Sequence, residues 1–267
     1  MGRIALIAAA ILFALLTIVV PVAAILARAF ADGTGAWLAA VTAPDTLAAL
    51  WLTVLTALIV VPINIVFGLC AAWAIARFRF PGRRALLVII EIPFAISPVV
   101  AGLCFLLVFG AYGPVGQALQ PYGIQLMFNL TGIVLVSLFV TCPFVLREVL
   151  PVLQADGEDE ERAALTLGAS GWQIFRLVTL PRVTWALLYG ATLATARAIG
   201  EFGAVSVVSG AIRGRTMTLP LQVEALYNDY DATGAFAAAT VLALIAMLTL
   251  ALRGLIAAFH PVRGARA

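Results

Sequence analysis

The stretch VLQADGEDEERAALTLGASGWQIFRLVTLPR, Val152–Arg182, is a polar, patterned segment between two apolar runs of the chain. Its acidic residues, Asp156 and Glu158–Glu161, suit the first turn of a helix, where free amide groups and the helix dipole favour negative charge. Small and apolar residues then share one helical face: Ala163, Ala164 and Leu167. Gly168 is suited to end this helix, so the first half of the segment predicts a short amphipathic helix.

The second half of the segment predicts another short helix. Ser170 can cap its start, and Pro181 is expected to end it and to begin the next membrane span. Bulky apolar residues lie three apart on one side: Trp172, Phe175 and Val178. Two such helices need cover for their apolar faces. Either they fold back onto the chain's own helix ends, or they fit a groove on a partner protein, and amphipathicity leaves both open.

The composition places the chain in a membrane. Hydrophobic residues make up 64% of the 267 residues, charged residues make up 11%, and the mean hydropathy is +1.11. Soluble domains carry roughly 25% charged residues. A water-soluble domain, a disordered tail and a basic nucleic-acid-binding module are therefore excluded, and one transmembrane domain over residues 1–267 is expected.

Nothing in the chain suggests metal or catalytic chemistry. The three cysteines, Cys70, Cys104 and Cys142, lie inside apolar runs without CxxC spacing, and the single histidine, His260, lies beside the C-terminus. The chain also has no GxxxxGK[ST] phosphate-binding loop, so any ATP hydrolysis must reside in another subunit.

About six transmembrane helices are expected, because a helix needs ~20 mostly apolar residues to cross a bilayer. The qualifying stretches are Ile4–Ala27, Leu47–Ala76, Ala85–Phe109, Gly132–Leu150, Val183–Val208 and Ala235–Ala258. The first exceeds the ~7–15 residues of a signal-peptide core, so it is predicted to be a retained helix. The second is long enough for a tilted span, or for a short surface helix followed by a span.

Arginine in the short loops predicts the orientation, because cytoplasmic loops are enriched in Lys and Arg. All 16 basic residues are arginine. With the N-terminus inside, the inner segments hold Arg77–Arg84, with four arginines, then Arg162, Arg176 and Arg182, and finally Arg263 and Arg266. The outer segments hold Arg28, Arg213 and Arg215. Both termini are therefore predicted to be cytoplasmic.

The segment from Arg162 resembles the cytoplasmic loop of bacterial ABC-importer permeases, whose pattern is E-A-A, three residues, G, nine residues, I, one residue, L-P. The matching positions are Ala163, Ala164, Gly168, Val178, Leu180 and Pro181. Arg162 occupies the position of the family's glutamate, and Glu160 and Glu161 precede it. A contact that the glutamate usually makes is therefore either weakened or taken over by a neighbouring acid.

Longer segments are similar to sulfate/thiosulfate permeases, and most similar to the W-type of their two paired subunits. They are Phe78–Arg84 (FRFPGRR), Ile92–Leu103, Thr141–Leu153, Trp185–Gly214 and Thr218–Tyr230. The resemblance covers roughly residues 45–260. Molybdate and tungstate permeases share an ARAxGEFGA-like stretch, so they remain the alternative oxyanion class.

The resemblance implies an all-α type I ABC-importer permease fold in the bacterial inner membrane, with a cytoplasmic two-helix coupling loop over about residues 153–182. It also implies a T-type sister permease, two copies of a cytosolic ATP-binding subunit that carries ATP and Mg, and a periplasmic sulfate-binding protein. This chain is then expected to be no enzyme and to bind no cofactor or nucleic acid. The expected ATPase-docking residues are Glu161, Arg162, Ala163, Ala164, Gly168, Trp172, Phe175, Leu180 and Pro181.

Ionisable residues at membrane depth point to a functional site, because they cost ~2.5–3.5 kcal/mol on insertion scales. Arg197 and Glu201 lie four residues apart in the fifth apolar stretch, which predicts one helix face. In one interpretation the two residues form an internal ion pair. In the other, Arg197 offers a passing oxyanion a transient counter-charge, and Glu201 keeps the attraction between arginine and anion weak. The two interpretations are compatible. Glu91, Arg147 and Glu148 are expected to form a network nearer the cytoplasmic side.

Two other classes of protein are compatible with an apolar chain of this size. A self-contained secondary anion carrier usually has more spans, often as inverted repeats, and it would transport when expressed alone. A scaffolding membrane subunit would use the loop to bind a partner and would contain no path.

Overall fold

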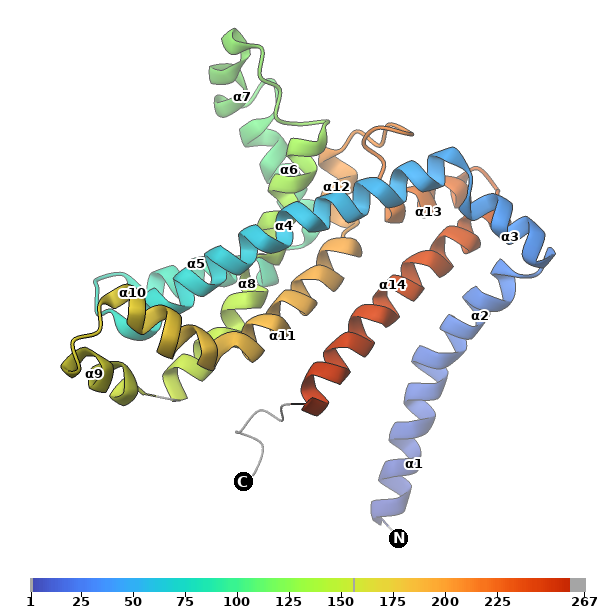
Figure 1. Ribbon diagram of the computed structural model, residues 1–267. Helices are drawn as coiled ribbons and strands as arrows, with labels where there is room; N and C mark the ends of the chain where they lie inside the picture. The colour runs from blue at the N-terminus through green and yellow to red at the C-terminus, as the bar shows by residue number, and fades with distance from the viewer. Residues whose placement is uncertain (1, 156, 260–267) are drawn as a thin grey trace.

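The computed structural model describes residues 2–155 and 157–259, and every element of these residues is a helix (Figure 1). Asp156, His260, Arg263 and Arg266 lie outside the described residues. Six helical stretches are long and apolar enough to cross a membrane, as the sequence predicts. The all-α fold and the number of spans are thereby confirmed.

The six membrane-crossing stretches alternate with short helices. The first stretch comprises α1 (Gly2–Ala14), η1 (Leu15–Val19) and α2 (Val20–Ala29), and the second is α4 (Pro44–Arg77) after the short α3 (Gly33–Val41). Then follow α5 (Arg83–Ala95), α6 (Pro98–Phe109), α7 (Pro114–Leu119), η2 (Gln120–Tyr122), α8 (Leu130–Ala155) and α9 (Asp159–Thr166). The chain continues through α10 (Gly171–Ile174), η3 (Phe175–Thr179), α11 (Leu180–Ile199), α12 (Gly203–Val208), α13 (Leu219–Asn228) and α14 (Ala232–Phe259).

The largest buried cluster lies where α4, α8 and α11 pack together. Val145 of α8 is fully buried between two glycines, Gly68 of α4 and Gly190 of α11. A Cβ atom on Gly68 would lie 2.6 Å from the Val145 Cβ, and one on Gly190 would lie 2.9 Å from the Val145 Cα. In lipid, where apolar surface alone does not drive helix association, such close backbone approach contributes much of the packing energy.

The second stretch is a single long helix. At 1.5 Å per residue, the 34 residues of α4 are about 51 Å long, which exceeds a hydrocarbon core of about 30 Å. Figure 1 shows α4 running obliquely across the molecule. Of the two alternatives for this stretch, a single long helix is therefore observed, and α3 is a separate short helix before it.

Two of the apolar stretches predicted as single spans are not continuous helices in the structure. The stretch Ala85–Phe109 divides into α5 and α6, because Pro98 lacks an N–H group and biases Ser97 to a non-helical ψ of 134°. The stretch Val183–Val208 also divides, since α11 ends at Ile199 and α12 begins at Gly203. The membrane-crossing stretches are instead Pro98–Tyr122 and Gly171–Ile199.

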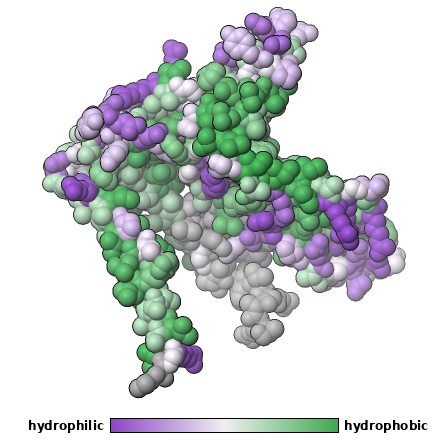
Figure 2. Space-filling model, turned by 180° about the vertical axis from the view of Figure 1, so that it is seen from behind, coloured by the Kyte–Doolittle hydropathy of each residue, from purple (hydrophilic) through white to green (hydrophobic). Residues whose placement is uncertain are grey.

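The first stretch lies apart from the bundle. None of the 18-residue window that qualifies Gly2–Ala29 as a span is buried, and only its second half, α2, packs on α14 (Figure 1). Figure 2 shows apolar side chains along most of its length. A helix that is apolar all round and uncovered by its own chain is suited to a lipid environment or to another membrane subunit.

We expect Gly68→Ala to destabilise the α4–α8 contact, because overpacking a fitted core costs about 1–3 kcal/mol. Gly254→Ala in α14 is the matched control, since a Cβ atom there meets nothing within 4 Å. The thermal unfolding of both variants in detergent is the measurement. A Gly68→Ala variant as stable as the unchanged chain would contradict the tight packing over Val145.

Candidate functional site

The 153–182 loop contains the first helix that the sequence predicts. α9 begins after Glu158 and carries Asp159, Glu160 and Glu161 in its first turn. The backbone of Gly168 has a φ of +84°, a left-handed conformation that favours glycine, and it ends the α9 segment as expected. The start of this loop is therefore correctly predicted, apart from Asp156, which lies outside the described residues.

The second loop helix starts as predicted but does not end at Pro181. Ser170 and Gln173 form a reciprocal capping box, in which the Ser170 N–H donates to the Gln173 side chain over 2.7 Å. The chain then runs without interruption from α10 through η3 into α11. η3 is a five-residue π-helical turn that directly precedes Leu180 and Pro181, and its wider hydrogen-bond pattern accommodates the proline. The second loop helix is thus the beginning of the fifth span.

The loop has one face that folds back onto the chain and one that does not. Phe175 lies 5.4 Å from Trp73 of α4 between ring centroids, and Leu180 packs against the α4–α8 core. In contrast, Leu165, Leu167 and Trp172 expose 63%, 88% and 67% of their surfaces. The fold-back alternative is therefore confirmed for Phe175 and Leu180, and Leu165, Leu167 and Trp172 stay uncovered by the chain.

The remaining expected docking residues differ in exposure. Ala163, Gly168 and Pro181 are exposed, and Ala164 is half-buried. Arg162 is exposed and forms a 2.8 Å ion pair with Glu158 within the loop. Glu160 pairs with Arg182 of α11 at 3.2 Å.

Glu161 faces inward and is held by Arg77 at the end of α4. Arg77 Nε and Nη2 donate to the two carboxylate oxygens of Glu161 over 2.7 and 3.1 Å. The Thr179 hydroxyl donates to Glu161 Oε1 over 2.8 Å, and Arg77 Nη1 donates to the Leu153 carbonyl oxygen over 2.8 Å. The Arg77 and Glu161 side chains are only 9% and 13% exposed. We call this group the Arg77–Glu161 clamp.

Sequence reasoning missed the clamp. It treated Arg77 as one of four arginines that set the orientation, and it placed Glu161 among residues that face a partner. The two residues are 84 positions apart, and no spacing rule connects them. The one available signal was an acidic residue directly before the position where the family's glutamate is replaced by Arg162.

The second candidate site lies at the break between α11 and α12. Arg197 Nη1 forms an ion pair with Glu201 Oε2, and Glu201 Oε1 accepts a 2.9 Å hydrogen bond from the Ala204 N–H. Glu201 is buried, whereas the Arg197 side chain is 30% exposed. Glu201 follows the end of α11, so the expectation of one shared helix face is wrong. The pair forms across the break, and Glu201 also caps α12.

The two helix breaks lie side by side. α6 and α12 pack closely: a Cβ atom on Gly203 would lie 3.2 Å from the Pro98 Cβ, and one on Gly102 would lie 2.7 Å from the Ala204 carbonyl oxygen (Figure 1). Irregular backbone at membrane depth is tolerated where neighbouring protein covers it. The Arg197–Glu201 pair therefore sits where two helix breaks meet, at the end of the span Gly171–Ile199.

Two residues of the network expected nearer the cytoplasmic side, Arg147 and Glu91, form an ion pair. Arg147 Nε lies 3.3 Å from Glu91 Oε1, and the Arg147 guanidinium carbon lies 3.9 Å from the centroid of the Phe94 ring. Both charged side chains are more than a third exposed. An exposed pair of this kind contributes little stability, roughly 0–1 kcal/mol.

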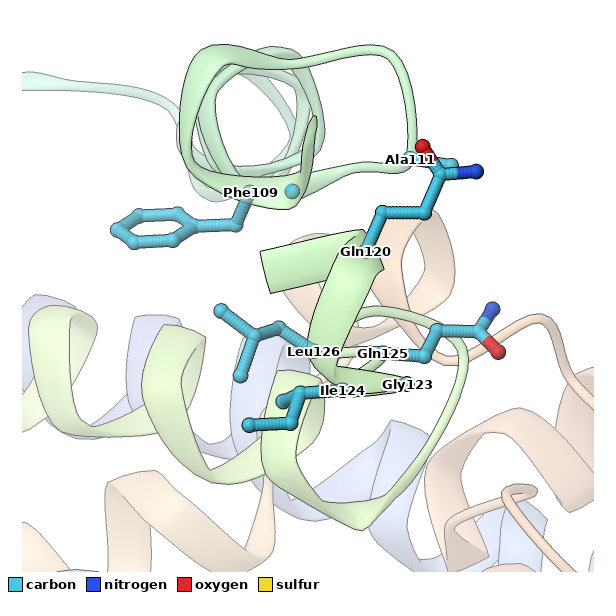
Figure 3. Close-up of a pocket in the computed structure, with 8 residues that line it drawn as sticks. Phe109, Ala111, Gln120, Gly123, Ile124, Gln125 and Leu126 are labelled. Carbon is cyan, nitrogen blue, oxygen red and sulfur yellow. The ribbon is translucent and has the colours of Figure 1, made fainter. Parts of the chain in front are cut away.

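A pocket of about 290 Å³ lies at the opposite end of the molecule from the 153–182 loop. Figure 3 shows its lining, which comes from the end of α6 and from the turns around α7 and η2: Phe109, Ala111, Gly116, Gln120, Gly123, Ile124, Gln125 and Leu126. No charged residue is among them, so this pocket offers an anion no counter-charge. Among the residues that the structure describes, no three His, Cys, Asp or Glu residues are grouped to hold a metal ion.

Comparison with known proteins gives one consistent result. Residues 64–261 match the family model described as "Binding-protein-dependent transport system inner membrane component". The "Sulfate transport system permease protein CysW" of Escherichia coli K12 is 55% identical over 239 residues, which cover 90% of this chain and 82% of that protein. The corresponding CysT of the same organism is 35% identical over 240 residues, which cover 90% and 87%.

A solved structure shares the fold. A chain of a bacterial alginate ABC transporter, crystallised with an alginate-bound periplasmic protein, superposes with a TM-score of 0.79 over 96% of this chain and 93% of that chain. The sequences are 15% identical, so this likeness concerns the fold alone.

We expect Glu201→Ala to destabilise the chain more than Glu201→Gln. Both variants remove the charge that pairs with Arg197, but the glutamine keeps an oxygen that accepts from the Ala204 N–H. A buried donor left without an acceptor costs about 1–3 kcal/mol, which is the expected difference in the free energy of unfolding. Thermal unfolding in detergent measures it, and equal stabilities would show that the cap on α12 contributes nothing.

Proposed function

The chain belongs to the family of binding-protein-dependent transport system inner membrane components, and we propose that it is the permease subunit of an ATP-driven sulfate/thiosulfate importer. The observation that carries the proposal is the 55% identity with a CysW permease across 90% of this chain. The lower identity with CysT, 35%, supports the W-type position in a pair of unlike permeases. Membership in this family also argues against a self-contained carrier.

The chain is a multi-pass protein of the bacterial inner membrane with both termini in the cytoplasm. The arginine-rich segments support this orientation, because they include Arg77–Arg84 and the 153–182 loop. In Figure 1 the start of α1, the end of α14 and the 153–182 loop lie toward one side, and α7 lies toward the other. α7 and the neutral pocket would then face the periplasmic binding protein.

The exposed face of the 153–182 loop docks a cytosolic ATP-binding subunit, of which the complete transporter holds two copies. Leu165, Leu167 and Trp172 support this role, because apolar side chains this exposed at the end of a membrane protein need a covering partner. ATP and Mg²⁺ belong to that partner. Its closure would draw the two loops of the permease pair together, tilt the spans and open the path outward, and hydrolysis would restore the inward-facing state.

Arg197 gives the passing oxyanion its counter-charge at membrane depth. Its side chain is partly exposed beside two helix breaks, and the positive end of the α6 dipole lies at one of them. Glu201 neutralises part of the arginine charge, so the attraction stays weak. A conduit requires weak binding, because a tightly held anion would leave slowly.

Complementation tests the transport role. In a bacterial strain that lacks only its W-type subunit, this chain is expected to restore uptake of labelled sulfate, provided that the ATP-binding subunit is present. Thiosulfate and molybdate serve as competitors and rank the anions. Lack of rescue despite confirmed assembly would favour a molybdate-type permease, and uptake without the ATPase would contradict the importer.

Gly168→Asp tests the docking role. The variant is expected to abolish sulfate uptake while the subunit stays in the membrane, because it places a carboxylate in the apolar docking turn. Gly82→Asp is the matched control: both glycines have φ near +85°, at +84° and +87°, and neither has an atom within 4 Å of an added Cβ. The backbone strain is therefore the same, about 1–2 kcal/mol or less for Asp. Normal uptake by Gly168→Asp would disprove docking at this turn.

A further inference from the structure

We infer that the Arg77–Glu161 clamp is the joint through which the 153–182 loop moves α4 during transport. The inference rests on the proposed function and adds a positioning residue, Arg77, that touches neither the anion nor ATP. The clamp would convert a displacement of the loop into a displacement of a membrane-crossing helix. Its loss would leave ATP hydrolysis running without a matching flow of sulfate.

The clamp joins α4 to both ends of the loop. Through its guanidinium, Arg77 binds the Leu153 carbonyl oxygen at the end of α8 and the Glu161 carboxylate on α9. Through Glu161, it also reaches the hydroxyl of Thr179, in the turn before α11. A bidentate arginine–carboxylate pair fixes orientation as well as distance. The loop therefore cannot rotate or slide relative to the end of α4 without breaking these bonds.

An aromatic contact one turn earlier on α4 reinforces the joint. Trp73 precedes Arg77 by four residues, so both lie on one face of the helix. The Trp73 ring lies 5.4 Å from Phe175, and Phe175 lies 5.6 Å from Trp172 between ring centroids. Trp172 belongs to the exposed docking face. A displacement of that face is therefore transmitted to α4 by the packed aromatic rings and by the Arg77–Glu161 ion pair.

Two other ion pairs of the loop, among the residues that the structure describes, are more exposed than the clamp. The Arg162–Glu158 pair stays within α9 and its cap, and both side chains are exposed by 72% and 38%. The Arg182–Glu160 pair connects α9 with α11 but leaves Glu160 65% exposed. The exposed Arg162–Glu158 pair is screened by water and contributes little, whereas Arg182 is only 22% exposed in its pair with Glu160. The Arg77–Glu161 pair is largely shielded from water. It also connects the loop to α4, a span that is not adjacent to the loop in the sequence.

α4 can carry the movement across the membrane. Between Thr53 and Arg77 it is about 36 Å long, which is more than the hydrocarbon thickness. The buried Thr53 hydroxyl oxygen accepts a 2.8 Å hydrogen bond from the Leu219 N–H, at the start of α13. α4 is thus bonded to the docking loop at one end and to the α12–α13 segment at the other. A shift of Arg77 would therefore also displace the residues that contact α4 near Thr53, toward the other side of the membrane.

The test uses the complete transporter, with its sister permease, ATPase and binding protein, in proteoliposomes. The readout is the amount of labelled sulfate imported per ATP hydrolysed. We expect Arg77→Gln, Glu161→Gln and the double variant to lower this ratio by about tenfold, the usual size of a coupling between sites. Arg79→Gln is the control, because Arg79 is exposed in the same inner segment, and its ratio is expected to stay unchanged.

The double variant separates coupling from folding. Each single variant leaves one partner of the clamp without its counterpart, whereas the double variant leaves no unpaired charge there and is expected to assemble normally. The inference would be overturned if the double variant assembled and imported as much sulfate per ATP as the original transporter. The same result for Arg77→Gln would also overturn it. If the unchanged transporter and Arg79→Gln also import no sulfate, the proposed function fails instead.

Discussion

In a bilayer the backbone must satisfy its own hydrogen bonds, and the arrangement of this chain follows from that requirement. Every described element is a helix, and the three that pack most closely, α4, α8 and α11, have no break within the membrane-crossing core. Two of the helix breaks lie beside membrane-crossing stretches, at Ile96–Ser97 and at Gly200–Phe202. These two breaks lie against each other, because α6 and α12 pack through glycines. Irregular backbone is thereby sheltered by protein.

Burial away from water explains why the two least exposed pairs of charges form. Glu201, the most buried charged residue of those that the structure describes, pairs with Arg197 and caps α12, and Arg77 binds Glu161 between α4 and α9. A charge withdrawn from water is stable only with a partner of good geometry. The pairs differ in exposure: Arg197 remains partly open, which suits contact with an anion, while the Arg77–Glu161 clamp is closed, which suits transmission of force.

The 153–182 loop combines a fixed side and an open side. Phe175, Leu180 and Glu161 attach it to its own spans, and Leu165, Leu167 and Trp172 remain uncovered. An element that only connected two spans would not need the second set, and a freely mobile docking arm would not need the first. The arrangement suits a rigid part that receives a push from outside the chain and passes it inward.

The sequence alone determined the features that depend on local chemistry. Apolar run length predicted six spans, the acidic first turn predicted α9, and Ser170 and Gly168 predicted a cap and a turn, because each of these follows from a few neighbouring residues. Similarity along most of the chain predicted the family. The sequence-based expectations failed at two prolines: a π-helical turn carries the chain past Pro181, whereas Pro98 does break its span. Only the tertiary structure placed Arg77 against Glu161, since residues 84 positions apart meet through the packing of α4 beside α8 and the loop, and no periodicity encodes that meeting.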